Sequence, residues 1–422
     1  MARFLVASTP VVGHTTPMAL VVRSLVDRGH DVHWYTGVGL RADVEASGAR
    51  FHPITHAVDF TRVGLVDLVP ELRTASRLGR LRLYFERAFV DAAPGGIRDM
   101  EAILAESPAD VLLADMLIMA APMVSERGGP PFARLATTRL GTYSRDTPPP
   151  GLGLPPGFPL RDRLLTAVHR RLFGHTTRHL DDVREGLGLP RRRRSPFDEF
   201  MSPWLFMQDT AESFEYPRRD LPPQVHFIGA LTPEPPAFTA SWLPELRSGR
   251  PVVLVALSTV ANARANLIGA AVEALSGEDV AAVIATGGAE FTLPATLPGN
   301  VHIEQHVPLA AVMPFASVFV TNGGYGGVQM ALSHGVPMVV AGVTEEKPDI
   351  AARVAWSGTG VRLATDAPSA DVLRTAVRNV LADHRYSDAA ARLAADLGRH
   401  DAPTEAANLL EKLASTGRPV HR

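Results

Sequence analysis

The chain has 422 residues, with 42 Lys and Arg against 44 Asp and Glu, and it contains no Cys. This length favours two domains, and the balanced charge points to no nucleic-acid or anionic-membrane partner. The absence of Cys excludes disulfides, thiol nucleophiles and Cys-ligated metals, and it fits a cytoplasmic enzyme. We expect neither a signal peptide nor stable membrane insertion, because no apolar run reaches about 18 residues.

The first half of the chain alternates strand-like and helix-like stretches, which predicts a parallel α/β sheet. Its opening βαβ unit includes Gly29, which stands where a helix C-cap belongs. The expected elements, in chain order, are a strand at 4–7, a loop at 8–17, a helix from Met18, a strand at 32–35, a strand at 111–114 that leads to Asp115, a helix at about 116–127 and a strand at 132–136.

Two segments interrupt this alternation. A long amphipathic helical stretch at about 161–186 fits either a wall of a substrate cleft or a plain surface pair of helices. The arginine run 191–194 that follows is better explained as a solvated turn than as an anion site. The Pro-rich segment 232–236 cannot be helical, and it predicts a linker between domains.

The second half repeats the strand and helix alternation, so we predict two doubly wound domains. The boundaries are expected at about 1–230 and 240–400, with a last helix in 400–422 that can cross back to the first domain. The expected elements are strands at 252–257, 280–285, 301–304, 318–321 and 337–341, and helices at 262–275, 328–332, 370–381, 387–397 and 404–413.

A glycine-rich turn dominates the second half. Asn322, Gly323, Gly324, Tyr325, Gly326 and Gly327 lie between a predicted strand and a predicted helix. A helix start offers free N–H groups that bind phosphate, and glycines let an anion approach the backbone closely. The polar turn 344–349 follows the next strand and faces the same crevice. The implied ligand is a nucleotide sugar, although glycine turns of this kind often serve packing alone.

His14 and Asp115 are the candidate catalytic groups of the first half. In open α/β sheets, ligands bind beyond the carboxyl ends of the strands, and both residues follow predicted strands of one sheet. A carboxylate can orient an imidazole that takes a proton from a hydroxyl. A spacing of about 100 residues does not show that the two side chains are in contact. The competing interpretation is that His14 is an ordinary loop residue and that Asp115 caps a helix.

Two motifs resemble a known family. The segment 13–17, Gly-His-Thr-Thr-Pro, resembles the Gly-His-x-x-Pro loop of family 1 glycosyltransferases. The segments 306–308, 322–327 and 346–348 resemble the donor-binding signature of that family, and bacterial enzymes that glycosylate natural products are the most similar members. The resemblance implies the GT-B architecture, in which two Rossmann-like domains face a central cleft. It also implies inversion at the sugar C1 without a metal or another cofactor.

The resemblance assigns roles to individual residues. It makes His14 the general base and Asp115 its orienting partner. It places the nucleotide base against His306 and the backbone of Val307, and it makes Ser258 a phosphate contact. The remaining donor residues implied by the resemblance are Asn322, Gly323, Gly324, Gly326 and Gly327 at the diphosphate and Glu346 and Lys347 at the sugar.

Three positions depart from the family pattern. Asn322 replaces a His, and Lys347 replaces a Gln that follows an acidic residue, here Glu346. Met330 stands where many members have a Glu that binds both ribose hydroxyls, which a thioether cannot do. We therefore hypothesise a TDP-sugar donor rather than a UDP-sugar, since a deoxyribose loses less when this contact is missing.

The resulting prediction is an inverting glycosyltransferase that acts on a hydroxyl of a small, mostly apolar natural product. The alternatives are an enzyme of this architecture that acts on a lipid carrier at a membrane, for which the sequence shows no strong docking patch, and a catalytically silent partner protein. A dinucleotide oxidoreductase is disfavoured because the first turn lacks Gly-x-Gly-x-x-Gly. The acceptor, the sugar and the oligomeric state stay open, with a homodimer as one arrangement.

Overall fold

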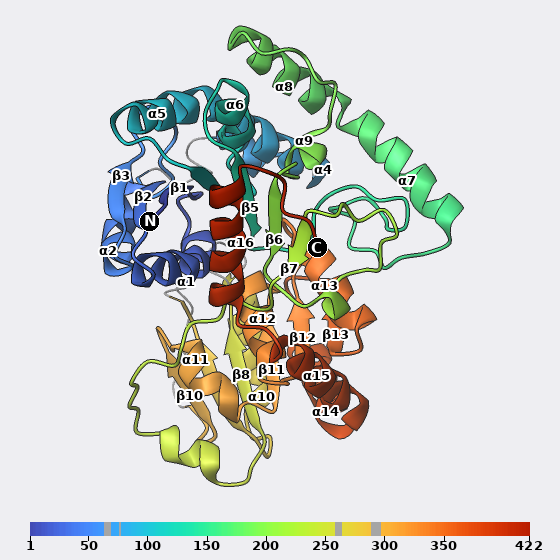
Figure 1. Ribbon diagram of the computed structural model, residues 1–422. Helices are drawn as coiled ribbons and strands as arrows, with labels where there is room; N and C mark the ends of the chain where they lie inside the picture. Colours follow the sequence, from blue (N-terminus) through green and yellow to red (C-terminus); the bar gives the residue numbers. More distant parts are fainter. Residues whose placement is uncertain (63–68, 76, 258–263, 288–296) are drawn as a thin grey trace.

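The computed structural model describes residues 1–62, 69–75, 77–257, 264–287 and 297–422 (Figure 1). It contains two parallel sheets, each covered by helices on both faces. The seven-stranded sheet has the order β3-β2-β1-β4-β5-β6-β7, and the six-stranded sheet has the order β10-β9-β8-β11-β12-β13. The protein therefore has two Rossmann-like domains with the GT-B architecture, as predicted.

The first sheet takes its strands from the first half of the chain. The strands are β1 (Arg3–Ala7), β2 (Asp31–Thr36), β3 (Arg50–Pro53), β4 (Val111–Asp115), β5 (Phe132–Ala136), β6 (Leu205–Gln208) and β7 (Val225–Phe227). The accompanying helices are α1 (Val12–Asp27), α2 (Arg41–Ala46), α4 (Arg77–Leu83), the π-helix Tyr84–Val90, α5 (Ala93–Glu106), α6 (Ala120–Glu126), α7 (Pro159–Leu172), α8 (Gly174–Gly186) and α9 (Pro196–Glu199).

The second sheet follows an extended segment after β7. Its strands are β8 (Val252–Ala256), β9 (Ala281–Ala285), β10 (Val301–Glu304), β11 (Val318–Thr321), β12 (Met338–Ala341) and β13 (Gly360–Leu363). Its helices are α10 (Arg264–Leu275), α11 (Leu309–Val312), α12 (Tyr325–Ser333), α13 (Lys347–Trp356), α14 (Ala370–Ala382) and α15 (His384–Leu397), and the chain ends with α16 (Ala402–Thr416).

The central strands are buried on both faces, which explains their nearly continuous apolar sequences. Every residue of β4 is buried, and so is every residue of β8. Separate clusters of apolar side chains fill the two faces of each sheet. Within the described residues, no helix combines the length and the apolar content needed to cross a bilayer.

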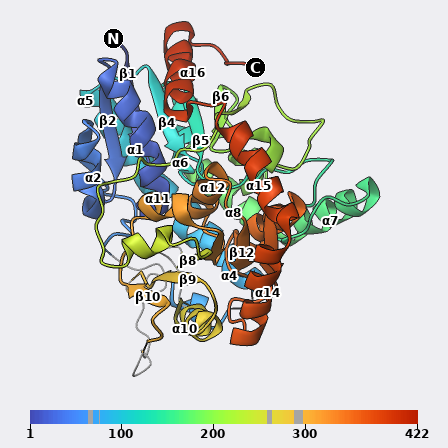
Figure 2. The same ribbon diagram turned by 90° about the horizontal axis from the view of Figure 1, so that it is seen from below.

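The last helix, α16, packs against the first domain and not against the second, which it follows in sequence. Figures 1 and 2 both show it beside α1. Its apolar face, which includes Ala406, Ala407, Leu410 and Leu413, is fully buried in the same cluster as the α1 side chains. The exact domain boundaries at about 230, 240 and 400 stay a prediction.

Several elements begin or end elsewhere than predicted. Helix α1 begins at Val12, so His14 lies in its first turn and not in a loop, and Pro17 lies inside the helix. Residues 12–17 lack the apolar repeat on which the prediction relied, although Thr15 and Pro17 are buried. Helix α12 similarly begins at Tyr325, which places Gly326 and Gly327 in its first turn instead of in the preceding loop.

Two further predicted helices differ from the structure. The stretch 161–186 is two helices, α7 and α8, which meet at Phe173. Helix α6 begins four residues later than predicted. The turn before it is held by side chains, because Asp115 accepts a hydrogen bond from Leu117 N and Arg134 donates to the carbonyl of Ile118.

Candidate functional site

The His14 and Asp115 side chains meet at the carboxyl ends of two neighbouring strands. Strand β1, which precedes α1, pairs with β4, which ends in Asp115. His14 Nδ1 lies 2.8 Å from Asp115 Oδ2, and the two side chains are 19% and 0% exposed. The pairing of β1 with β4 therefore brings together two residues about 100 positions apart, and the imidazole stays partly exposed to solvent.

Asp115 is held by contacts from three sides. Its carboxylate accepts hydrogen bonds from Thr9 N (3.1 Å) and from Leu117 N (3.1 Å). Its backbone carbonyl accepts one from the buried guanidinium of Arg134 (2.7 Å). The carboxylate therefore has little freedom to rotate away from the imidazole, and it fixes the tautomer in which Nδ1 carries the proton.

The electrostatics of the pair favour a basic imidazole. Burial alone would lower the pKa of His14, but the charge and hydrogen bond of Asp115 and the charge of Glu346 raise it above 6.5. Burial alone would raise the pKa of Asp115, but His14 and the hydrogen bonds from Thr9 and Leu117 lower it. Asp115 is therefore ionised at neutral pH, and a proton on His14 is stabilised.

The glycine turn of the second domain leads into the start of α12. The first intrahelical bond runs from Val328 N to Gly324 O (3.0 Å), so the N–H groups of the first turn precede it and have no helical partner. Gly323 has a φ of 90° and donates its N–H to Thr321 Oγ1 (3.3 Å), so this N–H is already engaged. A Cβ on Gly326 would meet no atom within 4 Å, which leaves room for an anion there.

Glu346 and Lys347 begin α13 beside this turn. Glu346 precedes the helix, and its charge acts on His14, so the polar turn of the second domain lies near the imidazole of the first. Lys347 is buried and forms an ion pair with Glu345, which has a φ of 53°. The charges of Glu345 and Glu346 also help to raise the pKa of Tyr84 to about 12, after burial, which places Tyr84 near this turn.

The other predicted donor residues lie at the same edge of the second sheet. His306 is exposed and Val307 half-buried in the loop between β10 and α11, beyond the carboxyl end of β10. Met330 is buried in α12 among apolar side chains, so the position of the missing Glu holds a packed thioether. Ser258 lies outside the described residues.

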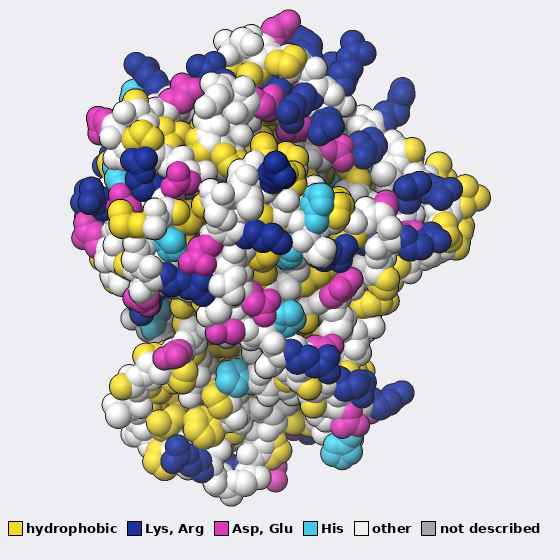
Figure 3. All heavy atoms as spheres, in the orientation of Figure 1, with side chains coloured by type: hydrophobic (Ala, Val, Ile, Leu, Met, Phe, Trp, Pro, Cys, Tyr) yellow, Lys and Arg dark blue, Asp and Glu magenta, His cyan; other side chains and the backbone are white. Residues whose placement is uncertain are grey.

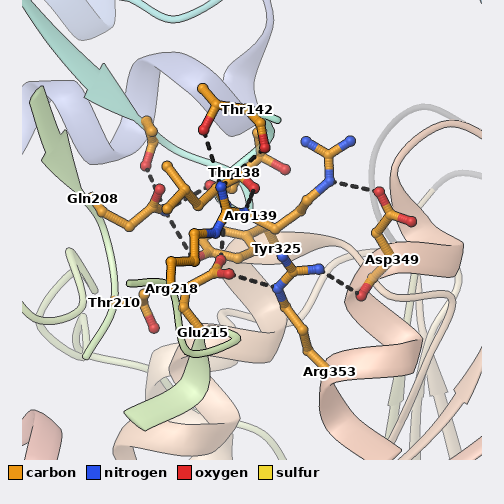
Figure 4. Close-up of polar contacts among 12 residues, drawn as sticks. Thr138, Arg139, Thr142, Gln208, Thr210, Glu215, Arg218, Tyr325, Asp349 and Arg353 are labelled. Carbon is orange, nitrogen blue, oxygen red and sulfur yellow. Dashed lines mark hydrogen bonds and ion pairs between the residues drawn. The ribbon is translucent and has the colours of Figure 1, made fainter. Parts of the chain in front are cut away.

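A buried polar network connects the two domains, and it was not predicted from the sequence. Asp349 in the first turn of α13 accepts hydrogen bonds from Arg139 Nε (2.8 Å), Gly151 N (2.6 Å) and Gly153 N (2.7 Å). Figure 4 shows the Arg139 guanidinium reaching Asp349 across the domain boundary. The first-domain loop 139–153 is thus tied to the helix that begins with Lys347.

Further contacts extend this network to α13 and to the residues around β6. Arg353, also on α13, donates through Nε to Glu215 Oε2 (2.8 Å), and its guanidinium lies 4.2 Å above the centre of the Tyr216 ring. In the ion pairs Arg139–Asp349 and Arg353–Glu215, all four side chains are nearly fully buried. No sequence signal marks such pairs, because their partners lie as many as 210 residues apart.

Helix α12 makes a second set of contacts with the first domain. Tyr325 Oη accepts a hydrogen bond from Gln208 Nε2 (3.2 Å), and Gln329 Oε1 accepts one from Thr210 Oγ1 (2.9 Å). The side chains of Tyr325 and Gln329 therefore face the domain boundary and not the free N–H groups at the start of the helix. The start of α12 is held in a fixed position relative to β6.

Comparison with known proteins identifies the family. Residues 267–413 match the model described as "Erythromycin biosynthesis protein CIII-like, C-terminal domain". The chain is 44% identical over 420 residues to 4'-demethylrebeccamycin synthase of Lentzea aerocolonigenes, covering 98% of this chain and 99% of the relative. The chain belongs to the family 1 glycosyltransferases. The enzyme is a glycosyltransferase of the natural-product type.

Solved structures show the same fold as this glycosyltransferase. The glycotransferase of kitacinnamycin superposes with a TM-score of 0.78 at 24% identity, over 97% of this chain and 98% of that one. Spinosyn rhamnosyltransferase SpnG, complexed with thymidine diphosphate, superposes with a TM-score of 0.69 at 19% identity, over 97% and 100% of the two chains. At these identities the likeness concerns the fold alone.

Proposed function

We propose that the enzyme transfers a sugar, with inversion, from a nucleotide diphosphate donor to a hydroxyl of a small, mostly apolar acceptor. The single observation that carries this proposal is the His14–Asp115 pair, on which the charge of Glu346 of the donor domain also acts. A buried carboxylate, an imidazole with a raised pKa and a facing helix start form a site suited to hydroxyl attack on a sugar phosphate.

In the proposed reaction, the acceptor oxygen bonds to C1 of the sugar while the bond between C1 and the diphosphate oxygen breaks. The hydroxyl proton passes to His14 Nε2, because Nδ1 is engaged by Asp115. The electron pair of the broken bond stays on the diphosphate. The N–H groups of the first turn of α12, including that of Gly326, would stabilise this charge, so we propose that no metal is required. His306 and Val307 would hold the nucleotide base.

The proposed donor is a TDP-sugar. The support is Met330, a buried thioether in place of a residue that could accept hydrogen bonds from both ribose hydroxyls. Thymidine lacks the 2′-hydroxyl and therefore loses less from this replacement. SpnG, whose structure contains thymidine diphosphate, shares the fold, but the preference proposed for this chain rests on Met330.

The catalytic assignment is tested by replacing His14 with Ala. We expect turnover with a TDP-sugar to fall roughly 100-fold or more, the scale of general-base catalysis, while TDP affinity stays unchanged. Asp115→Asn should also turn over slowly, because it loses the orientation of the imidazole. Wild-type turnover by His14→Ala would remove His14 from the mechanism. Because no metal is proposed, the unchanged enzyme should keep full activity after chelation with EDTA.

The donor assignment is tested by competition among UDP, 2′-deoxy-UDP and TDP. The pair UDP and 2′-deoxy-UDP isolates the ribose hydroxyl, and the pair 2′-deoxy-UDP and TDP isolates the 5-methyl group. We expect both deoxy nucleotides to bind at least as tightly as UDP. A clear preference for UDP would refute the TDP proposal while leaving the glycosyl transfer itself intact.

A further inference from the structure

Helix α7 is oriented with its apolar face toward solvent. Its exposed large apolar side chains, together with the residue before it, are between 46% and 73% exposed, although such residues are usually buried. The spacing of four residues places the helical members on one stripe. These residues are Phe158, Leu160, Leu164, Val168 and Leu172, and we call them the α7 stripe.

Polar contacts on the inner face fix this orientation. The buried residues of α7 are Asp162 and His169. Asp162 accepts a hydrogen bond from Gly157 N (2.9 Å), and His169 Nδ1 lies 2.7 Å from Tyr143 Oη. Burial, the main cause, lowers the pKa of His169 to about 4, so the imidazole is neutral at physiological pH. Rotating the helix to bury its stripe would break the contact between His169 and Tyr143 and expose the buried imidazole.

The charges beside the stripe are positive. Arg163 and Arg171 are exposed and form no ion pair with any described residue, whereas Arg161 and Arg170 pair with acids. The single acid of α7, Asp162, is buried. Figure 3 shows hydrophobic and basic side chains together on the projection at the right, where Figure 1 places α7. An apolar stripe flanked by arginines fits the headgroup region of an anionic membrane.

We propose that the α7 stripe docks the enzyme on an anionic phospholipid surface, lying in the interface without spanning it. A second copy of the chain fits less well. Pairing α7 with its own copy, parallel or antiparallel, brings Arg163 or Arg171 beside arginines of the copy, and no exposed carboxylate of the helix offsets that repulsion. An anionic lipid surface satisfies the apolar stripe and the two arginines together.

The stripe begins close in sequence to the loop that contacts the donor domain. The stripe begins at Phe158, five residues after Gly153, whose N–H is bound by Asp349 of the donor helix α13. A docked α7 would therefore lie next in the chain to the loop 139–153, which contacts the donor helix α13. The sequence predicted an amphipathic helical stretch here, as either a cleft wall or a surface pair of helices. Periodicity does not tell which face points outward, so the α7 stripe was not predicted.

The test is co-sedimentation of the full chain with vesicles of phosphatidylglycerol and phosphatidylcholine in equal parts, compared with vesicles of phosphatidylcholine alone. We expect binding to the anionic vesicles that weakens as salt is raised. The double variant Leu160→Gln/Leu164→Gln should reduce partitioning by about tenfold or more, because each change removes the burial of a large apolar side chain. The double variant Arg163→Gln/Arg171→Gln should lose the preference for phosphatidylglycerol.

Matched controls are Val372→Gln, another exposed apolar side chain on α14, and Arg392→Gln, an exposed arginine on α15. Both should bind vesicles as the unchanged protein does. No binding to anionic vesicles, or equal binding by the Leu160→Gln/Leu164→Gln variant and the Val372→Gln control, would overturn the proposal. So would a dimer that dissociates in the leucine variant, which would assign the stripe to a second copy. The assay needs no substrate, so its result is independent of the proposed reaction.

Discussion

Replacing Asp349 with Ala should destabilise the protein more than any single change at an exposed ion pair. Asp349 is nearly fully buried and accepts three hydrogen bonds, from Arg139 and from the backbone of Gly151 and Gly153. Burial alone would raise its pKa, but Arg139, Arg353 and the two backbone donors lower it, so the carboxylate is charged in the folded protein. Its removal leaves the buried Arg139 guanidinium without a counter-charge.

The expected cost follows from this geometry. Removing one member of a buried ion pair costs about 3–5 kcal/mol, because the remaining charge is left unpaired. Arg139→Ala should cost less, about 1.5–3 kcal/mol, since Asp349 keeps the two backbone donors and the neighbouring charge of Arg353. The double variant Arg139→Ala/Asp349→Ala leaves neither charge of the pair without its partner. Its loss of unfolding free energy should therefore be smaller than the sum of the losses in the two single variants.

The assay is urea unfolding of both single variants, the double variant and a control, Asp146→Ala. Asp146 pairs with Arg219 at the surface of the same loop, where the contact contributes little. The reasoning would be refuted if Asp349→Ala were no more costly than Arg139→Ala, or if it were as mild as the control. Hydrogen exchange of residues 147–157 should be faster in Asp349→Ala, since Gly151 and Gly153 lose their acceptor.

Three further predictions concern the pH dependence and the donor turn. With a TDP-sugar, kcat/KM should rise with pH through the pKa of His14, which lies above 6.5. Asp115→Asn should move that rise to lower pH, because burial lowers the pKa of the imidazole and the charge of Asp115 no longer raises it. Gly326→Ala should weaken TDP binding, measured by calorimetry, without lowering the unfolding temperature. The control is Gly269→Ala, which should leave TDP binding unchanged. Gly269 is also a helical glycine with open space around its Cβ position. Burial raises the pKa of Asp209 from 3.8 to about 7, so stability should fall as pH rises through this window. Asp209→Asn should remove that loss, which is on the order of a few kcal/mol, and raise the unfolding temperature at pH 8 more than at pH 5.

The sequence was sufficient to predict the central strands of both sheets and the residues that follow them. It did not predict β3, β6, β7 and β13, which lie toward the sheet edges and are only three or four residues long. Buried parallel strands have continuous apolar runs, and functional residues directly follow them, which is why His14, Asp115 and the glycine turn could be singled out. Contact between His14 and Asp115 could not be derived, because it depends on which strands are neighbours. Helix starts were misplaced at Val12 and Tyr325, since the residues of these first turns lack an apolar repeat.

Features that depend on the packing of distant segments were not predictable. Asp349 is an ordinary charged residue in sequence, and its contact with Arg139 exists only because the two domains meet there. The orientation of α7 was hidden for a related reason. Its periodicity indicates two faces, but only the contacts of Asp162 and His169 show that the polar face is the inner one.

The return of α16 to the first domain has a consequence for protein engineering. The chain passes between the domains twice, once in the segment after β7 and once between α15 and α16. Leu410 and Leu413 fill the core of the first domain, and Val420 N donates to Trp204 O (2.8 Å). A chimera that exchanges donor specificity should therefore replace the second domain as an internal insert and keep the native C-terminal helix, because exchanging everything after the linker would supply the first domain with a foreign piece of its own core.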